Sequence, residues 1–125
     1  LKDTALSIYK NTFEGWSLLW SYNQEYLVKF IDLYKELMLF WHSKIPNYIY
    51  DCHYEKLVND PINETKKLIS FCNLDWEDNC LDHTKNKTGI KTVSIAQARS
   101  PIYKNSVNLN EEYLKYLNFL NNISE

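Results

Sequence analysis

The sequence has few of the residues that build phosphate loops, disulfide frameworks or membrane spans. Its two glycines, Gly15 and Gly89, stand far apart, so no glycine-rich loop that could cradle a phosphate occurs among the 125 residues. Three cysteines cannot all pair with one another and none lies in a Cys-x-x-Cys motif, so we expect buried free thiols in a reducing, cytoplasmic compartment. Apolar runs such as Leu37 to Trp41 are far shorter than the roughly 20 residues that span a bilayer.

Acidic residues are absent from one long stretch, between Asp82 and Glu111. Its basic residues give it a charge of +5, whereas the rest of the chain has nine basic and sixteen acidic residues. A basic, hydroxyl-rich segment in an otherwise acidic chain is typical of an anion-binding site, and a solvated loop with a chance charge bias is the alternative. The basic residues of this stretch are Lys85, Lys87, Lys91, Arg99 and Lys104.

Hydrophobic residues make up 45% of the chain and aromatic residues 15%, which is enough for a packed core. In the first third of the chain, apolar residues recur at steps of three and four, which predicts helices. We expect one over residues 3–11 with Asp3 as its N-cap, and a long amphipathic helix over residues 22–44 that stops before Pro46. An irregular aromatic link, residues 12–21, joins the two.

Helix-start signals occur twice more. Asp60 followed by Pro61 predicts a capped helix, and a turn with a short helix follows over residues 74–81. Asn108 with Glu111 three residues later resembles a capping box and predicts a final helix. The expected buried stripe of the helix after Asp60 is Ile62, Leu68, Ile69 and Cys72.

Residues 47–54 alternate in a way that predicts a strand, with Tyr48, Tyr50, Cys52 and Tyr54 on one face. A lone strand cannot stand by itself, because its backbone groups need partners in a sheet. We therefore expect the other strands to lie elsewhere, in the rest of a larger domain or in a partner.

Three segments carry residues suited to binding an anionic ligand. Leu1 to Tyr9 places Ser7 inside a helix, Tyr54 stands at the end of the predicted strand, and Thr92 to Tyr103 gathers hydroxyls, an amide and an arginine on a loop. Helix starts, strand ends and arginine-bearing loops are frequent phosphate-binding places. An ordinary capped helix, a core tyrosine and a solvated loop are the alternatives.

In their order and spacing these segments resemble elements of sulfotransferases that use 3′-phosphoadenosine 5′-phosphosulfate. Leu1 to Tyr9 resembles Arg-Asp/Asn-Pro-x-Asp-Thr-x-x-Ser, and Tyr50 to Pro61 resembles Arg-Tyr-Glu-Asp-Leu-Val-x-Asp-Pro, with His53 in the arginine position. Leu68 to Trp76 resembles Leu-x-x-Phe-Leu-Gly-Leu-Pro-Trp. Ser94 to Tyr103 is similar to Ser-x-x-Gln-Val-x-x-Pro-Ile/Val-Tyr/Asn of the tyrosylprotein and bacterial tetratricopeptide-linked branch.

The resemblance implies that residues 1–125 are the C-terminal portion of one sulfotransferase domain. Its fold is α/β and P-loop-like, although this portion is expected to be mostly α-helical with about one strand, and the N-terminal, phosphosulfate-binding half is absent. The implied reaction moves a sulfuryl group from the phosphosulfate to an acceptor hydroxyl or amine. A non-enzymatic helical interaction domain with a basic anion-binding loop and a kinase-like fragment are the alternatives.

The resemblance also implies roles for particular residues. Ser94 stabilises the transferring group, Ser7 holds the 3′-phosphate, and no metal is needed. The implied partners are the nucleotide cosubstrate, an unknown acceptor and the missing half of the enzyme, with no nucleic acid; a tyrosylprotein-type parent implies the Golgi lumen or a membrane. The implied cofactor-binding residues are Ser7, Tyr54, Ser94, Gln97, Arg99 and Tyr103.

Overall fold

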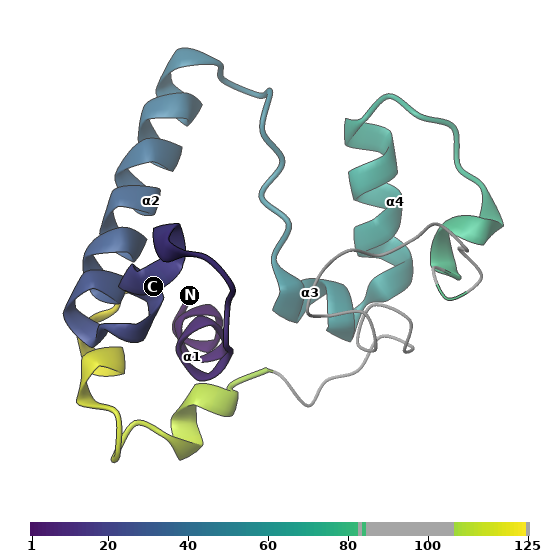
Figure 1. Ribbon diagram of the computed structural model, residues 1–125. Helices are drawn as coiled ribbons and strands as arrows, with labels where there is room; N and C mark the ends of the chain where they lie inside the picture. The colour runs from purple at the N-terminus through teal and green to yellow at the C-terminus, as the bar shows by residue number, and fades with distance from the viewer. Residues whose placement is uncertain (83, 85–106, 125) are drawn as a thin grey trace. The chain divides into compact units, whose positions relative to one another are not determined.

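The computed structural model describes residues 1–82, 84 and 107–124. It divides the chain into two compact units. One contains Leu1–Ile49 together with Ser106–Glu125, and the other contains Tyr50–Asn105. The first unit thus joins the beginning and the end of the chain, whereas the second consists of the middle (Figure 1).

The first unit begins with helix α1, Lys2–Lys10, which agrees with the predicted helix to within one residue. Its N-cap is Leu1, without a side-chain bond, so the prediction that Asp3 caps this helix is wrong. Asp3 lies within the first turn, where a carboxylate suits the helix dipole. At the other end the Asn11 amide donates to the Ser7 carbonyl at 2.7 Å and so satisfies one of the last carbonyls.

Helix α2, Gln24–Lys44, confirms the long amphipathic helix. It begins where the Asn23 side chain accepts a hydrogen bond from the Tyr26 N–H at 3.0 Å, and it ends before Pro46. The expected irregular link over residues 12–21 is confirmed only at residues 12–15, because a 3₁₀ helix, η1, spans Trp16–Tyr22. Trp20 of η1 stacks on Phe30 of α2 with a centroid distance of 3.8 Å, which fastens this short helix to the long one.

The predicted final α-helix is absent, and two 3₁₀ helices, η4 (Leu109–Glu112) and η5 (Asn118–Asn122), occupy these residues. Asn108 has a left-handed backbone with φ of 59°, whereas an N-cap residue needs an extended one, so the capping box does not form. The short helices let Phe119, Leu120 and Ile123 all turn inward.

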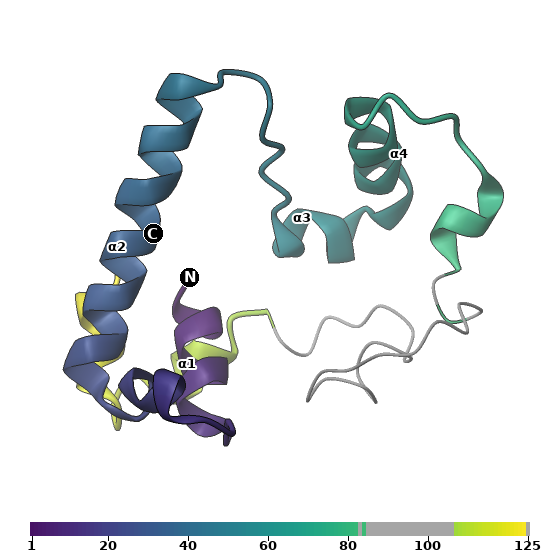
Figure 2. The same ribbon diagram turned by 45° about the horizontal axis from the view of Figure 1, so that its top comes forward.

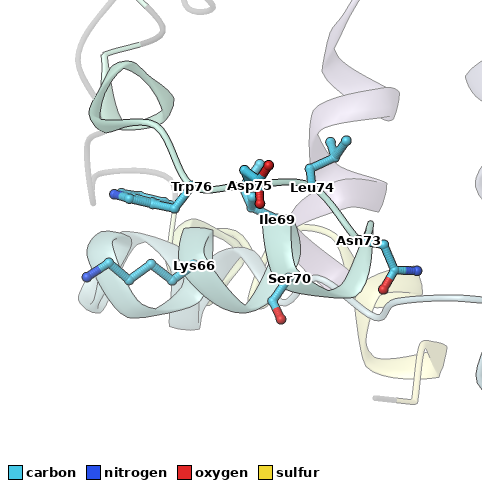
Figure 3. A pocket seen from close by; sticks show the side chains of 7 residues that line it. All are labelled: Lys66, Ile69, Ser70, Asn73, Leu74, Asp75 and Trp76. Atoms are coloured by element: carbon cyan, nitrogen blue, oxygen red, sulfur yellow. The ribbon is translucent and has the colours of Figure 1, made fainter.

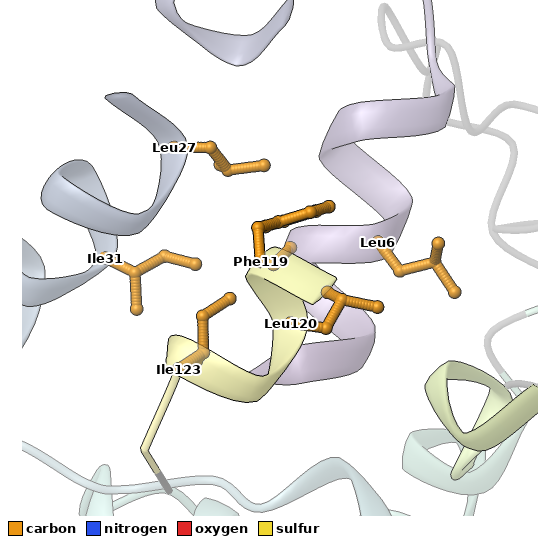
Figure 4. Close-up of a cluster of buried hydrophobic side chains, with 7 residues drawn as sticks. Leu6, Leu27, Ile31, Phe119, Leu120 and Ile123 are labelled. Carbon is orange, nitrogen blue, oxygen red and sulfur yellow. The ribbon is translucent and has the colours of Figure 1, made fainter. Parts of the chain in front are cut away.

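The core of the first unit joins α1, α2 and η5, which come from opposite ends of the sequence (Figure 4). Lys35 of α2 adds a polar link, because its ammonium donates to the carbonyl and hydroxyl of Ser124. The residues in this core are Ala5, Leu6, Leu27, Ile31, Phe119, Leu120 and Ile123.

The second unit contains α3, Tyr54–Asn59, α4, Pro61–Phe71, and the 3₁₀ helix η2, Asp78–Leu81 (Figure 2). The Asp60-Pro61 start and the short helix before residue 82 are confirmed. The predicted buried stripe of α4 is wrong, because no residue of α4 is buried. Cys52 and Cys72 are exposed and Cys80 is half-buried, so the expectation of buried thiols is also wrong.

The predicted strand over residues 47–54 does not form, and the described part of the chain contains no strand. Asn47 takes a left-handed turn with φ of 64°, and Tyr54 already belongs to α3. The physical reason is that a strand needs a neighbouring strand to bond its backbone N–H and C=O groups, and none of the described residues forms one. The structure therefore confirms one part of the predicted fold, the mostly helical character of this portion.

Candidate functional site

Ser7 lies on α1 with its side chain exposed. The Asn11 amide, one turn later, donates to the Ser7 carbonyl and lies 3.5 Å from its Oγ. The hydroxyl therefore has room to donate to an anion while Asn11 steadies the turn that carries it. Neighbouring Ala5 and Leu6 point into the core, and this fixes which face of α1 Ser7 presents.

Asp3, one turn before Ser7, accepts hydrogen bonds from a distant segment of the first unit. Its Oδ2 accepts from the Asn108 N–H at 2.8 Å. Its Oδ1 accepts from the Asn110 N–H at 2.6 Å and from the Asn110 side-chain amide at 2.9 Å. A residue in left-handed conformation followed by a helical turn makes successive N–H groups converge on an anion, and here the Asp3 carboxylate fills that place.

Asp3 and Ser7 share one face of α1, because residues four apart on a helix lie one above the other, about 5–6 Å between Cβ atoms. The segment that Asp3 holds is therefore a close neighbour of the Ser7 face. The three N–H donors stabilise the Asp3 carboxylate where it lies. From the sequence, Asp3 carries a capping signal and matches the aspartate of the Asp-Thr-x-x-Ser part of the family element, but nothing local pairs it with residues more than a hundred positions away.

Tyr54, the second predicted contact within the described residues, is the first residue of α3 and is 40% exposed. Its position differs from the expected strand end, since no strand precedes it. The backbone at His53 is extended, so Tyr54 still stands where an extended segment enters a helix. Tyr54 belongs to the second unit and Ser7 to the first.

The remaining predicted site residues, Ser94, Gln97, Arg99 and Tyr103, lie outside the described residues. Among the residues that are described, no group of three or more histidine, cysteine or acidic side chains is placed to hold a metal ion. In the same residues, no helix combines the length and the apolar character needed to cross a membrane.

A hollow of about 620 Å³ lies in the second unit, where α4 ends (Figure 3). Lys66 lies over the Trp76 ring, 5.3 Å from its centroid, and Figure 3 shows both side chains at the same end of the hollow. Asn73 turns the chain at the other end, with φ of 54°. Neither Ser7 nor Tyr54, the two predicted site residues that the structure describes, lines this hollow, which is formed by the end of α4 and the residues after it.

The end of α4 itself matches one of the quoted elements. The Leu74 N–H donates to the Ile69 carbonyl at 3.1 Å and the Asn73 N–H to the Ser70 carbonyl at 3.0 Å, which is the Schellman pattern of a helix end. Asn73 stands at the glycine of Leu-x-x-Phe-Leu-Gly-Leu-Pro-Trp, the position that needs a left-handed backbone. The geometry thus explains why that position of the element favours glycine.

Comparison with known proteins agrees with these elements. A profile of the sulfotransferase family matches residues 2–78, which include Ser7, Tyr54 and the end of α4. The chain is also 32% identical over 117 residues to an uncharacterized protein of Aquifex aeolicus (strain VF5). That alignment covers 92% of this chain and 15% of the Aquifex protein, so the chain spans about 15% of the length of this relative.

No solved structure matches the chain significantly. The family match nevertheless covers more than half of the chain, and it contains both described site residues. From this match, and from the helix starts and helix end that the structure places within it, we conclude that the chain belongs to the sulfotransferase family.

Proposed function

We propose that the enzyme to which this chain belongs transfers a sulfuryl group from 3′-phosphoadenosine 5′-phosphosulfate to an acceptor hydroxyl or amine. This chain contributes the 3′-phosphate and nucleotide contacts, and the other half of a P-loop-like α/β domain contributes the phosphosulfate loop. The observation that carries the proposal is the family match across residues 2–78, which contains Ser7 on an exposed face of α1. The Ser94–Tyr103 segment supports the tyrosylprotein or tetratricopeptide-linked branch.

The six proposed nucleotide-binding residues fit a doubly phosphorylated nucleotide, because their side chains offer hydroxyls, an amide and a guanidinium as hydrogen-bond donors. The nucleotide supplies the sulfuryl group, whose bond to the phosphate oxygen breaks as a bond to the acceptor oxygen or nitrogen forms. Ser7 donates to the 3′-phosphate, and Ser94 donates to the oxygens on which charge builds during transfer. Tyr54, Gln97, Arg99 and Tyr103 orient the nucleotide, which lowers the entropy cost of an in-line attack.

An exposed apolar stripe along α2 supports a role for this chain as part of a larger domain. Its members recur at steps of four and three residues along one face of the helix, the spacing of a packed helix surface. They are Tyr26, Phe30, Leu33, Leu37 and Phe40, each between 44% and 60% exposed. Because the Aquifex relative is several times longer than this chain, we assign the stripe to contact with the other half of the same enzyme.

The isolated 125 residues are accordingly expected to be inactive and only marginally stable, because the residues of the apolar stripe of α2 stay between 44% and 60% exposed. Sulfuryl transfer by the chain alone, assayed with labelled phosphosulfate, contradicts this part of the proposal.

The cofactor proposal is tested by ligand-induced thermal stabilisation of the whole polypeptide that carries this chain. Adenosine 3′,5′-bisphosphate at about 100 times its Kd should add about 2.7 kcal/mol to the free energy of unfolding, whereas adenosine 5′-phosphate and ATP at the same concentration should add less. An absent shift, or equal shifts with all three nucleotides, contradicts the proposal. Equal shifts favour the interaction-domain alternative, and a larger ATP shift favours a kinase-like fragment.

Ser7 is tested in the same assay with the Ser7→Ala variant. Loss of one hydrogen bond to a charged phosphate should weaken binding of the bisphosphate by about 10- to 100-fold. The matched control is Ser43→Ala, since Ser43 is also an exposed helical serine of the first unit but donates to the Phe40 carbonyl. Unchanged binding by Ser7→Ala removes Ser7 from the site.

A further inference from the structure

We propose that Asp3 is a positioning residue: it holds residues 108–110 against the first turn of α1 and so sets the surroundings in which Ser7 meets the 3′-phosphate. This inference rests on the proposed function, because it assigns a role within that same site. In this proposal Asp3 does not contact the ligand itself and acts through residues 108–110, which it binds.

The contacts are those of a clamp between distant parts of the chain. Both carboxylate oxygens of Asp3 accept hydrogen bonds, from two backbone N–H groups and one side-chain amide, at 2.6–2.9 Å. The partners lie 105 and 107 residues further along the chain. Hydrogen bonds to a charged acceptor are about twice as strong as neutral ones, and Asn110 is 8% exposed, so water competes little at that end.

The clamp lies one turn from Ser7 on the same face of α1, which ties it to the proposed site. The hydrogen bond from the Asn108 N–H to Asp3 also holds the backbone at Asn108 against α1. Asn108 follows Tyr103 by five residues in the sequence. The N–H groups of residues 108 and 110 are used by Asp3 and are therefore not donors for a phosphate.

The variant that tests the clamp is Asp3→Asn in the whole polypeptide. It keeps the shape of the side chain but replaces one acceptor oxygen by an NH₂ group, which faces an N–H of the partner segment. The matched control is Asp32→Asn, because Asp32 is an exposed aspartate of α2 outside the clamp.

Two measurements are made on each variant. Hydrogen exchange of the segment 107–112 reports on the clamp itself, and Asp3→Asn should exchange about 10- to 100-fold faster. The ratio of Kd values for adenosine 5′-phosphate and adenosine 3′,5′-bisphosphate reports on the 3′-phosphate contact. We expect this ratio to fall about tenfold in Asp3→Asn and to stay unchanged in Asp32→Asn.

A merely structural role for Asp3 predicts faster exchange with an unchanged ratio, and that result overturns the inference. Unchanged exchange overturns the clamp as well. If the two nucleotides have equal Kd values in the unaltered protein, the proposed function itself is contradicted. That result is seen before any variant is made.

Where Asp3→Asn does not fold, Asn110→Ala takes its place. It removes the side-chain donor and leaves the two backbone donors, so we expect a three- to tenfold fall in the ratio of Kd values. An unchanged ratio in that folded variant overturns the inference.

Discussion

Asparagine occupies the left-handed backbone positions outside glycine in the described residues. Asn47, Asn73 and Asn108 have φ of 64°, 54° and 59°. Most side chains avoid this region because Cβ meets the following carbonyl, while asparagine tolerates it. A chain with two glycines thus still forms a Schellman helix end at Asn73 and the turn at Asn108 that aims N–H groups at Asp3.

Substitutions at Asn73 should distinguish the effect of backbone strain on the stability of the α4 end from the effect of losing the asparagine side chain. Asn73→Ala should destabilise the end of α4 by about 1 kcal/mol, whereas Asn73→Gly should be neutral or slightly stabilising. Hydrogen exchange of the Leu74 N–H, which bonds to the Ile69 carbonyl, measures the effect. Asn79→Ala is the control, because Asn79 is exposed and has no positive φ. Equal effects of alanine and glycine at residue 73 contradict this account.

Among the elements, α4 shows most directly how its start is specified. Asp60 accepts from the Asn63 side chain at 2.8 Å and from the Asn63 N–H at 3.3 Å, and Pro61 supplies a first helical residue that needs no hydrogen-bond acceptor. These hydrogen bonds, that of the Asn63 side chain first, hold the pKa of the Asp60 carboxyl below its ordinary value.

The lowered pKa of Asp60 predicts a pH dependence with a definite sign. Because the folded-state pKa lies below the unfolded one, the cap contributes stability above the unfolded pKa and loses it as the pH falls through the folded pKa. The protection of the first-turn N–H groups of α4, which is the intrinsic exchange rate at each pH divided by the observed rate, should therefore fall in acid. Asp60→Asn still caps the helix without titrating, so the protection of the same N–H groups should not change over that range. The same acid response in Asp60→Asn assigns the effect to another group.

At the scale of the whole molecule, the first unit depends on packing between the two ends of the chain. Leu120 is fully buried against α1 and α2, although more than seventy residues separate it from either helix. The second unit has Val58 as its one buried hydrophobic residue among those described. The two units therefore differ in how much stability their own side chains can supply.

Truncation of the core should show this difference. Leu120→Ala should lower the free energy of unfolding of the first unit by about 2–5 kcal/mol, since it removes buried methyl groups and leaves a cavity. Leu39→Ala, at a leucine of α2 that is 71% exposed, should stay within about 0.5 kcal/mol. Urea unfolding followed by tryptophan fluorescence measures both variants. Similar losses in the two variants indicate that Leu39 is covered in solution.

The sequence by itself determined the elements whose signals are local. The apolar spacing of α2, the stop before Pro46, the Asp60-Pro61 start and the short helix after Trp76 all depend on neighbours within a few residues. Ser7 and Tyr54 were predicted from their resemblance to family elements; the family match covers both positions, and their roles stay predictions. Ser94, Gln97, Arg99 and Tyr103 stay predictions.

Only the tertiary structure decided what depends on distant partners. The strand at 47–54 does not form, because none of the described residues pairs with it. The predicted final helix is replaced by η4 and η5, and Phe119, Leu120 and Ile123 reach the core. Asp3, expected to cap α1, instead binds residues 108–110. Each outcome rests on contacts between residues far apart in the chain, and such contacts leave no trace in local periodicity or capping motifs.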